Sequence, residues 1–265
     1  MAVAVNDSNA HAASIAIVTG TTAGLGHAVA LALLDRGWSV IGVARRASPF
    51  THPAYRHVAF DLARVADDPS GLAGALDAHL NAAPRSRVGL VNNAADPEGL
   101  MPLDRLEPRL LARVFAVNAS APIWLMGRAQ QATAPNAALR IANVSSGAGT
   151  TGFPGLAAYG ASKAALRLAG MSLAREWDGS VGPPGAAPQR RRANAAILSY
   201  EPGVVDTDMQ SYARSRSPDE FPWVGIFHDF LDRGLAVAPG RPAAEIVSFL
   251  ESDAAPPFSE RRFQP

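Results

Sequence analysis

The chain has 265 residues, of which 48% are hydrophobic and 18% are charged, with a net charge of +1 and no cysteine. This composition provides enough apolar residues for a packed core, and it excludes disulfides and thiolate metal sites. The charge balance gives no electrostatic footprint for nucleic acid or for an anionic membrane surface. The six histidines lack metal-ligand spacing, so we also expect no metal.

Two polar segments are expected to lie outside the folded core. Residues 1–13 have neither a basic region nor a long apolar run, and we predict a disordered tail rather than a signal peptide. Residues 179–188 are rich in Pro and Gly, and with Arg190, Arg191 and Arg192 they are predicted to form a solvated surface loop. No apolar segment approaches the roughly 18 residues of a membrane span. We therefore expect a cytoplasmic protein that contacts neither membrane nor nucleic acid.

From residue 14 onward, short apolar runs alternate with longer helical segments. Near-continuous apolar strands with helical crossovers indicate a parallel sheet that is covered on both faces. Residues 14–265 are therefore predicted to form one α/β domain, a Rossmann-type doubly wound parallel sheet with helices on both faces. The pattern predicts strands at 14–20, 39–45, 56–62, 87–95, 139–146 and 194–203, and helices at 26–37, 70–83, 104–133 and 157–177.

The turn after the first predicted strand is rich in glycine. The stretch TGTTAGLG, residues 19–26, ends this strand and opens the first helix. Gly20, Gly24 and Gly26 allow a tight turn, let backbone amides approach a pyrophosphate and place the helix N-terminus against its charge. Because the turn lies between a strand and a helix, it predicts a dinucleotide-binding loop.

The end of the second strand favours NADP(H) over NAD(H). An NAD site usually carries an acid about 20 residues after the glycine loop, where it bonds the ribose 2′-hydroxyl. Here Ala44 is followed by Arg45 and Arg46, and an arginine can pair with a 2′-phosphate instead. The alternative is that both arginines are solvated surface charges. Asp61, which is expected to close the third strand, is placed to accept a hydrogen bond from the adenine amine.

Lys163 is the only lysine among 24 basic residues, and it lies four residues after Tyr159. On a helix, residues four apart share a face, so the two side chains can act on one substrate and cofactor. A phenol has a pKa near 10, which a neighbouring ammonium lowers. Lysine can also bind ribose hydroxyls and relay protons, whereas arginine stays protonated. The pair is therefore predicted to be catalytic.

These motifs together resemble the short-chain dehydrogenase/reductase family over nearly the whole chain. Ala95 departs from the glycine that the family commonly has at the end of its central strand. The departure concerns the strand end rather than the chemistry. The matching segments are TGTTAGLG (19–26), NNAA (92–95), AVNASAP (116–122), NVSSGAG (143–149), YGASK (159–163) and PGVVDT (202–207).

The resemblance implies a role for each of four catalytic residues. Tyr159 would be the general acid for carbonyl reduction, while Lys163 would lower its pKa and hold the nicotinamide ribose. Ser146 lies thirteen residues before the tyrosine, the spacing of the family, and would orient the carbonyl oxygen. Asn118 would hold a water that links Lys163 to solvent. Thr207 would bond the carboxamide or phosphate region of the cofactor.

The same resemblance implies NADP(H) as cofactor and a small-molecule carbonyl as substrate. It also implies a homodimer or homotetramer formed through the helices at 104–133 and 157–177. The predicted cofactor-binding residues are Gly20, Thr22, Gly24, Leu25, Gly26, Arg45, Arg46, Asp61, Leu62, Asn92, Ala94, Tyr159, Lys163, Pro202, Gly203, Val205 and Thr207.

A closer likeness is to the benzil reductase and sepiapterin reductase branch of the family. It rests on the stretches SSGAG, PGVVDTDMQ and DRGLAVAP, and the branch uses NADPH on dicarbonyl and aryl ketone substrates. Arg262 stands where pterin reductases carry a substrate-anchoring acid, which counts against a pterin substrate. The expected activity is therefore that of a benzil reductase-like carbonyl reductase, an oxidoreductase acting on CH–OH and C=O groups.

Residues of about 208–235 are expected to form a substrate lid. Its aromatic residues either line an apolar pocket or pack the hydrophobic face of the lid helix itself, and the sequence leaves both possibilities open. These residues are Phe221, Trp223, Phe227 and Phe230. The predicted substrate contacts are Ser146, Phe153, Tyr159, Met209, Trp223 and Phe227.

Three alternative functions stay open from the sequence. Within the same chemistry, the substrate could be a 3-oxoacyl thioester or a pterin. In a different class, the protein could be a catalytically silent NADP-binding sensor or scaffold, because a fold alone does not determine function. The complete set of Asn118, Ser146, Tyr159 and Lys163 argues against the silent protein.

Overall fold

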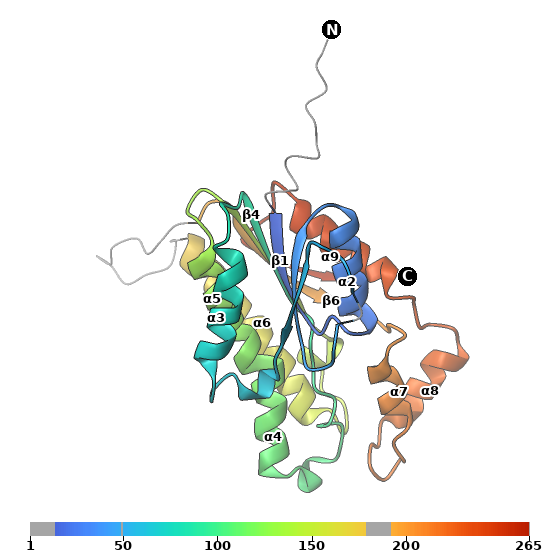
Figure 1. Cartoon of the computed structure of the whole chain (residues 1–265). Helices are drawn as coiled ribbons and strands as arrows, with labels where there is room; N and C mark the ends of the chain where they lie inside the picture. Colours follow the sequence, from blue (N-terminus) through green and yellow to red (C-terminus); the bar gives the residue numbers. More distant parts are fainter. Residues whose placement is uncertain (1–13, 49, 179–191, 265) are drawn as a thin grey trace.

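Figure 1 shows the computed structural model, which describes residues 14–48, 50–178 and 192–264. The predicted N-terminal tail and the predicted Pro/Gly-rich loop lie outside the described residues, at 1–13 and within 179–191.

Within the described residues, seven parallel strands form one sheet in the order β3-β2-β1-β4-β5-β6-β7. Helices cover both faces of this sheet, which confirms the predicted doubly wound α/β class (Figure 1). The strands are β1 (Ser14–Thr19), β2 (Ser39–Ala44), β3 (Tyr55–Ala59), β4 (Arg87–Asn92), β5 (Ala138–Val144), β6 (Ala195–Glu201) and β7 (Phe258–Arg262).

The central strands are buried along nearly their whole length and are mainly apolar, because both faces of the sheet are covered. Every residue of β1 is buried, and Ile17 pairs with Ile41 of β2 on one side and with Leu90 of β4 on the other. One hydrophobic core lies under α3 (Pro69–Leu80), α5 (Ala121–Ala132) and α6 (Ala157–Asp178). The second core lies under α2 (Gly24–Asp35) and α9 (Gly240–Glu251), on the opposite face (Figure 1).

The predicted strands are all present, but each ends one to three residues earlier than expected. The prediction that Asp61 closes a strand is wrong, because β3 ends at Ala59. The Asp61 carboxylate instead accepts a hydrogen bond from the Ala63 N–H (3.0 Å) and caps a short 3₁₀ helix, η1 (Leu62–Arg64). The apolar pattern therefore overestimates strand length at the carboxyl edge of the sheet, where turns begin before the apolar run ends.

The predicted helix at 104–133 is interrupted. A 3₁₀ turn, η2 (Leu103–Arg105), precedes α4 (Pro108–Phe115), which runs through a π-helical turn, η3 (Ala116–Ser120), into α5. Pro122 has no N–H to direct to the carbonyl of Asn118 four residues earlier, and its ring would crowd that carbonyl in an α-helix. The interruption therefore places Asn118 in a π turn, which hydrophobic periodicity does not reveal.

The combined helix Pro108–Ala132 is long and apolar enough to cross a membrane by length and composition, contrary to the expectation that no segment approaches a span. Its inward side chains belong to the hydrophobic core under the sheet, and 44% of its most apolar 18-residue stretch is buried. It is therefore a core helix of this fold. At its end, Arg192 donates to the carbonyls of Gln130 and Thr133 (2.7 and 2.6 Å), so this arginine caps a helix and is not a solvated loop residue.

The elements after β6 were not predicted individually. α7 (Asp208–Arg214) and α8 (Val224–Asp232) lie within the predicted lid range and project beyond the carboxyl edge of the sheet (Figure 1). At the base of this lid, the Val237 N–H donates to the Val204 carbonyl (2.9 Å), and the Asp206 N–H donates to the Val237 carbonyl (3.0 Å). The two ends of the lid are therefore joined before α9 packs beside α2 and β7 adds an edge strand to β6.

Candidate active site

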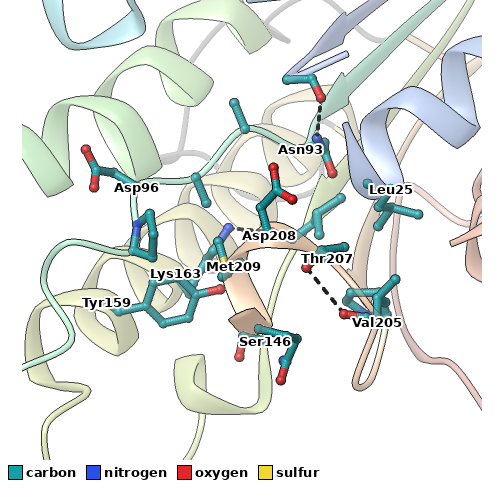
Figure 2. Close-up of a pocket in the computed structure, with 18 of the residues that line it drawn as sticks. Leu25, Asn93, Asp96, Ser146, Tyr159, Lys163, Val205, Thr207, Asp208 and Met209 are labelled. Atoms are coloured by element: carbon teal, nitrogen blue, oxygen red, sulfur yellow. Dashed lines mark hydrogen bonds between the residues drawn. The ribbon is translucent and has the colours of Figure 1, made fainter. Parts of the chain in front are cut away.

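A pocket of about 510 Å³ opens at the carboxyl edge of the sheet, and Figure 2 shows its central part. Residues at the ends of β1, β2, β4, β5 and β6 line one side of it, and residues of α7 and α8 line the other. This edge is where doubly wound sheets bind their ligands, and the volume suits a small-molecule site.

The glycine loop forms one wall of the pocket, and its glycines are required for different reasons. Gly20 and Gly24 have φ angles of +74° and +59°, which L side chains rarely adopt. A Cβ on Gly26 would lie 2.4 Å from both the Gly20 carbonyl oxygen and Asn93 Nδ2. Gly26 therefore lies behind the lining, where it lets α2 start close to the β4 turn. The N-terminus of α2 faces the pocket as a ready site for a pyrophosphate.

In the NNAA segment, Asn93 and Ala94 line the pocket, whereas the predicted Asn92 lies beneath it. Asn92 is buried in β4, and its Nδ2 donates to Asn143 Oδ1 of β5 (2.8 Å). Asn93 Nδ2 donates to the carbonyls of Thr19 (2.9 Å) and Gly20 (3.4 Å), which ties the end of β4 to the glycine loop. The doubled asparagine signals a functional strand end, but the point at which β4 ends decides which of the two reaches the pocket.

Arg45 and Arg46 line the pocket just after β2, and both are exposed. Arg46 Nε donates to Thr22 Oγ1 (3.2 Å), and its Nη2 lies 3.7 Å from the Asp208 carboxylate at the start of α7. Asp61 also lines the pocket. Two cations at the end of β2 suit a phosphate rather than a ribose hydroxyl.

Tyr159, at the start of α6, meets Ser146, which follows β5 (Figure 2). Burial raises the pKa of Tyr159 to about 12, and a hydrogen bond from Ser146 acts in the opposite direction. The sequence predicted a lowered pKa on account of Lys163. The shift is upward because the cost of removing a phenolate from water is the largest contribution in this site. The phenol is thus held in its protonated form, which is the form that a general acid needs.

Lys163 lies one helical turn from Tyr159, with Nζ 5.6 Å from the centre of the phenol ring. Its Nζ donates to the Val144 carbonyl (2.8 Å), and only 2% of the residue is exposed. Burial lowers the pKa of Lys163 to about 8, so the ammonium can lose its proton just above neutral pH. A guanidinium would remain charged in the same place. A lysine that can lose its proton is therefore chemically different from the arginines found elsewhere in the chain.

Asn118 is fully buried and does not line the pocket. Its Oδ1 accepts a hydrogen bond from the Asp96 N–H (2.7 Å), while its Nδ2 donates to the Asp96 carbonyl and to Ser162 Oγ (3.2 Å each). Ser162 Oγ in turn donates to the Tyr159 carbonyl (2.6 Å). The Asn118 amide is therefore committed to protein partners, and the expected water would have to bind the main-chain carbonyl in the π turn.

The aromatic residues of the lid divide into two groups. Phe221 is fully buried, and its ring lies so close to Gly155 that a Cβ there would be 2.8 Å away. It packs the lid onto the domain and does not line the pocket. The sequence left open whether the aromatic residues of the lid pack the lid itself or line the pocket, and the structure shows both, each for different residues. The lid residues Trp223, Phe227 and Phe230 line the pocket, beside Phe153 from outside the lid.

Most of the residues predicted for cofactor, catalysis or substrate share this one pocket. Three of them, Gly26, Asn92 and Asn118, lie behind its lining and support it. Those that line it are Gly20, Thr22, Gly24, Leu25, Arg45, Arg46, Asp61, Leu62, Ala94, Ser146, Phe153, Tyr159, Lys163, Pro202, Gly203, Val205, Thr207, Met209, Trp223 and Phe227.

Charged residues that the sequence pattern did not select also line the pocket. Asp96 pairs with Arg113 and bonds the Asn118 amide, while Glu201 at the end of β6 pairs with Arg262 of β7. Asp96 directly follows the NNAA motif, which is a usable signal, but Arg113 has no local signal on its helix. Across the described parts of the chain, no group of three or more His, Cys, Asp or Glu side chains could hold a metal ion.

Known proteins resemble this chain along most of its length. The family model described as short chain dehydrogenase matches residues 14–218. Two benzil reductases ((S)-benzoin forming), from Bacillus subtilis (strain 168) and Bacillus cereus, are each 26% identical to it. The matches cover 89% and 91% of this chain and 92% and 95% of those proteins. The crystal structure of the KRED1-Pglu enzyme matches with a TM-score of 0.73 and 27% identity over 90% of this chain and 95% of that one.

Proposed function

The chain belongs to the short-chain dehydrogenase family, and on that premise we propose that it is an NADPH-dependent reductase of a ketone or an α-dicarbonyl. The observation that carries the proposal is the convergence of Ser146, Tyr159 and Lys163 on the pocket that the glycine loop lines. A proton donor, an orienting hydroxyl and a titratable cation are the groups that carbonyl reduction requires.

The glycine loop and the turns after β2 and β3 line one side of the pocket, here called the cofactor wall, and their residues fit NADPH. The glycine loop and the N-terminus of α2 would take the pyrophosphate, because Gly20, Gly24 and Leu25 line the pocket where the free N–H groups of the helix begin. Asp61 would accept from the adenine amine, and Thr207 would bond the carboxamide region. Arg45 and Arg46 support NADPH over NADH, since both lie where a 2′-phosphate would need a cation.

When bound along the glycine loop, NADPH would supply the hydride for the carbonyl carbon. Tyr159 donates its proton to the carbonyl oxygen, and the Ser146 hydroxyl orients that oxygen by a hydrogen bond. As the phenol loses its proton, the Lys163 ammonium stabilises the phenolate and offsets the burial that raises the pKa of Tyr159. Lys163 also holds the nicotinamide ribose. A water on the Asn118 carbonyl would return a proton from solvent.

The substrate is proposed to carry flat apolar groups. Phe153 and Trp223 line the pocket with ring centres 5.9 Å apart, and Phe227 and Phe230 continue this surface. Aromatic walls favour aryl substituents through stacking and edge contacts. The relatives named benzil reductase support the same substrate class, at 26% identity.

We also propose that copies of the chain associate through the outer faces of α4, α5 and α6. Leu111, Ile123 and Leu168 lie on these helices and are 37%, 40% and 62% exposed. A homodimer or homotetramer would remove these side chains from water. A cytoplasmic location remains part of the proposal, and the absence of cysteine agrees with it.

The test is NADPH oxidation by the purified protein with benzil, an aryl monoketone, a 3-oxoacyl thioester and a pterin. We expect turnover with the first two. Faster turnover of the thioester or the pterin would assign those substrates instead. NADPH binding without oxidation of any substrate would favour a sensor.

Tyr159→Phe serves as the control for the chemistry. It should lower turnover by at least about 10³-fold, in the range that general acid catalysis contributes. Its affinity for NADPH should stay near that of the parent protein. Retained turnover in this variant would refute the assignment of the general acid.

A further inference from the structure

The guanidinium of Arg113, on α4, lies among three carboxylates at the edge of the pocket. Its Nε lies 2.8 Å from Asp96 and 3.8 Å from Glu98, and its Nη1 lies 3.7 Å from Asp61. Arg113, Asp61 and Asp96 all line the pocket. Only 6% of the Asp96 side chain is exposed, so its pairing with Arg113 is the least solvated of the three.

Asp96 connects Arg113 to the catalytic helix. One carboxylate oxygen accepts from Arg113 Nε, and the other accepts from the Glu98 N–H (2.9 Å), which fixes the turn after β4. The main-chain N–H and carbonyl of Asp96 hold the Asn118 amide from both sides. From Asn118 the hydrogen bonds continue through Ser162 to the Tyr159 carbonyl.

On its other side Arg113 faces the adenine end of the pocket. Asp61 uses Oδ1 to cap η1, and its Oδ2 is the oxygen that faces Arg113. Without the guanidinium, Asp61, Asp96 and Glu98 would repel one another around a pocket edge. A largely buried carboxylate such as Asp96 is costly without its partner, so the turn it holds would be expected to relax.

We propose that Arg113 is a positioning residue that joins the adenine end of the pocket to its catalytic end. The inference rests on the proposed function, since it takes Asp61 as the adenine contact and Asn118 as a member of the catalytic set. Arg113 holds Asp96 in place for Asn118 and holds Asp61 in place for the adenine. Its loss should therefore impair turnover and cofactor binding together.

Two single variants separate the two ends of this connection. Asp96→Asn keeps an acceptor for the Glu98 N–H but loses the ion pair, and it should lower kcat about tenfold with little change in KM for NADPH. Asp61→Asn should raise KM for NADPH and leave kcat within about twofold, because the pair of Arg113 with Asp96 stays intact. A purely structural role for Arg113 would not divide kcat and KM in this way.

Arg113→Gln should show both effects, a kcat about tenfold lower and a higher KM for NADPH. Arg109→Gln is the matched control, since Arg109 is exposed on the same helix, and it should behave as the parent protein. In the double variant with Asp96→Asn and Arg113→Gln, kcat should fall no further than in either single variant, because the two residues act through one contact.

Several results would overturn the inference. They are a parent-like kcat in Asp96→Asn, equal effects of Arg113→Gln and Arg109→Gln, or additive losses in the double variant. If Arg113→Gln does not fold, Asp96→Asn decides, since it removes the same ion pair and keeps the turn. If the parent protein reduces none of the carbonyls, the proposed function fails, and NADPH affinity measured by fluorescence titration decides for Arg113. A parent-like affinity in Arg113→Gln would then refute it.

Discussion

The two walls of the pocket are built differently. The cofactor wall consists of short turns that directly follow buried strands, and Asn93 after β4 bonds the Thr19 carbonyl at the end of β1. The lid wall begins after Val205 and ends at Val237, and these two residues pair in an isolated bridge at its base. It is docked mainly through a small separate cluster around Phe221.

This difference predicts which contacts stabilise the fold and which affect substrate binding. Substitutions in the cofactor wall disturb turns that are joined to the main cores, so they should change global stability or cofactor affinity. The lid packs through its own cluster, so we expect it to loosen without unfolding of the sheet. Substitutions there should change substrate binding and leave the sheet intact.

The largest expected effect is that of Lys163→Arg in α6, for which we expect turnover to fall at least about 10²-fold. The larger guanidinium must enter a position that is 2% exposed, where the Lys163 ammonium bonds the Val144 carbonyl. Steady-state NADPH oxidation measures the effect. Arg175→Lys, the reverse exchange at an exposed position of the same helix, is the control and should be silent. Parent-like activity in Lys163→Arg would make the single lysine a coincidence.

The pH dependence follows from the same lysine. Its pKa is lowered to about 8, so the ammonium is present below that pH and is lost above it. Carbonyl reduction should therefore slow by up to tenfold per pH unit above about 8, because the phenolate loses its stabilising charge. A kcat profile over this range measures it. A flat or rising profile would show that the protonated lysine is not needed.

Gly26→Ala should destabilise the whole domain by about 2–3 kcal/mol through overpacking. The new Cβ would meet the Gly20 carbonyl oxygen, a backbone atom that cannot swing away. Urea unfolding measures the loss in the free energy of unfolding. Gly74→Ala in α3 is the matched control, because a Cβ there meets open space, and it should be neutral or stabilising by roughly 0.5–1 kcal/mol. Equal outcomes for the two variants would contradict the tight contact.

Arg45→Ala should weaken NADPH by roughly 10–50-fold, the value of a charge-assisted contact, while NADH changes little. The two cofactors serve as each other's control, since they differ only in the 2′-phosphate. KM values for both, at fixed substrate, measure the effect. Equal losses for NADPH and NADH would remove the argument for NADP specificity.

Phe221→Ala tests the lid wall and has the smallest expected effect on the domain. Removing the ring empties the cluster that docks the lid, so KM for an aryl ketone should rise about tenfold while the global unfolding transition shifts little. Leu231→Ala, at a 49% exposed position of the lid, is the control. A large drop in global stability for Phe221→Ala would show that lid and sheet fold as one unit.

The features that the sequence predicted correctly are local. Apolar runs predicted the strands and the doubly wound class, because a strand covered on both faces buries side chains on both and is mainly apolar. The strand-end motifs and the spacing of Tyr159 and Lys163 predicted residues that do line one pocket, since parallel strands all end at the same edge. The exact strand ends were missed, because caps such as that of Asp61 depend on single hydrogen bonds.

What only the tertiary structure decided depends on contacts between distant segments. Burial determines that the pKa of Tyr159 is raised, although the neighbouring lysine alone predicts the opposite. The π turn commits the Asn118 amide to Asp96, and the packing of the lid sends Phe221 inward and Trp223 to the pocket. The sequence thus determined which groups are available for the chemistry, because they lie in short motifs. The tertiary structure decided how each group is solvated and held, because desolvation and long-range hydrogen bonds exist only in the packed chain.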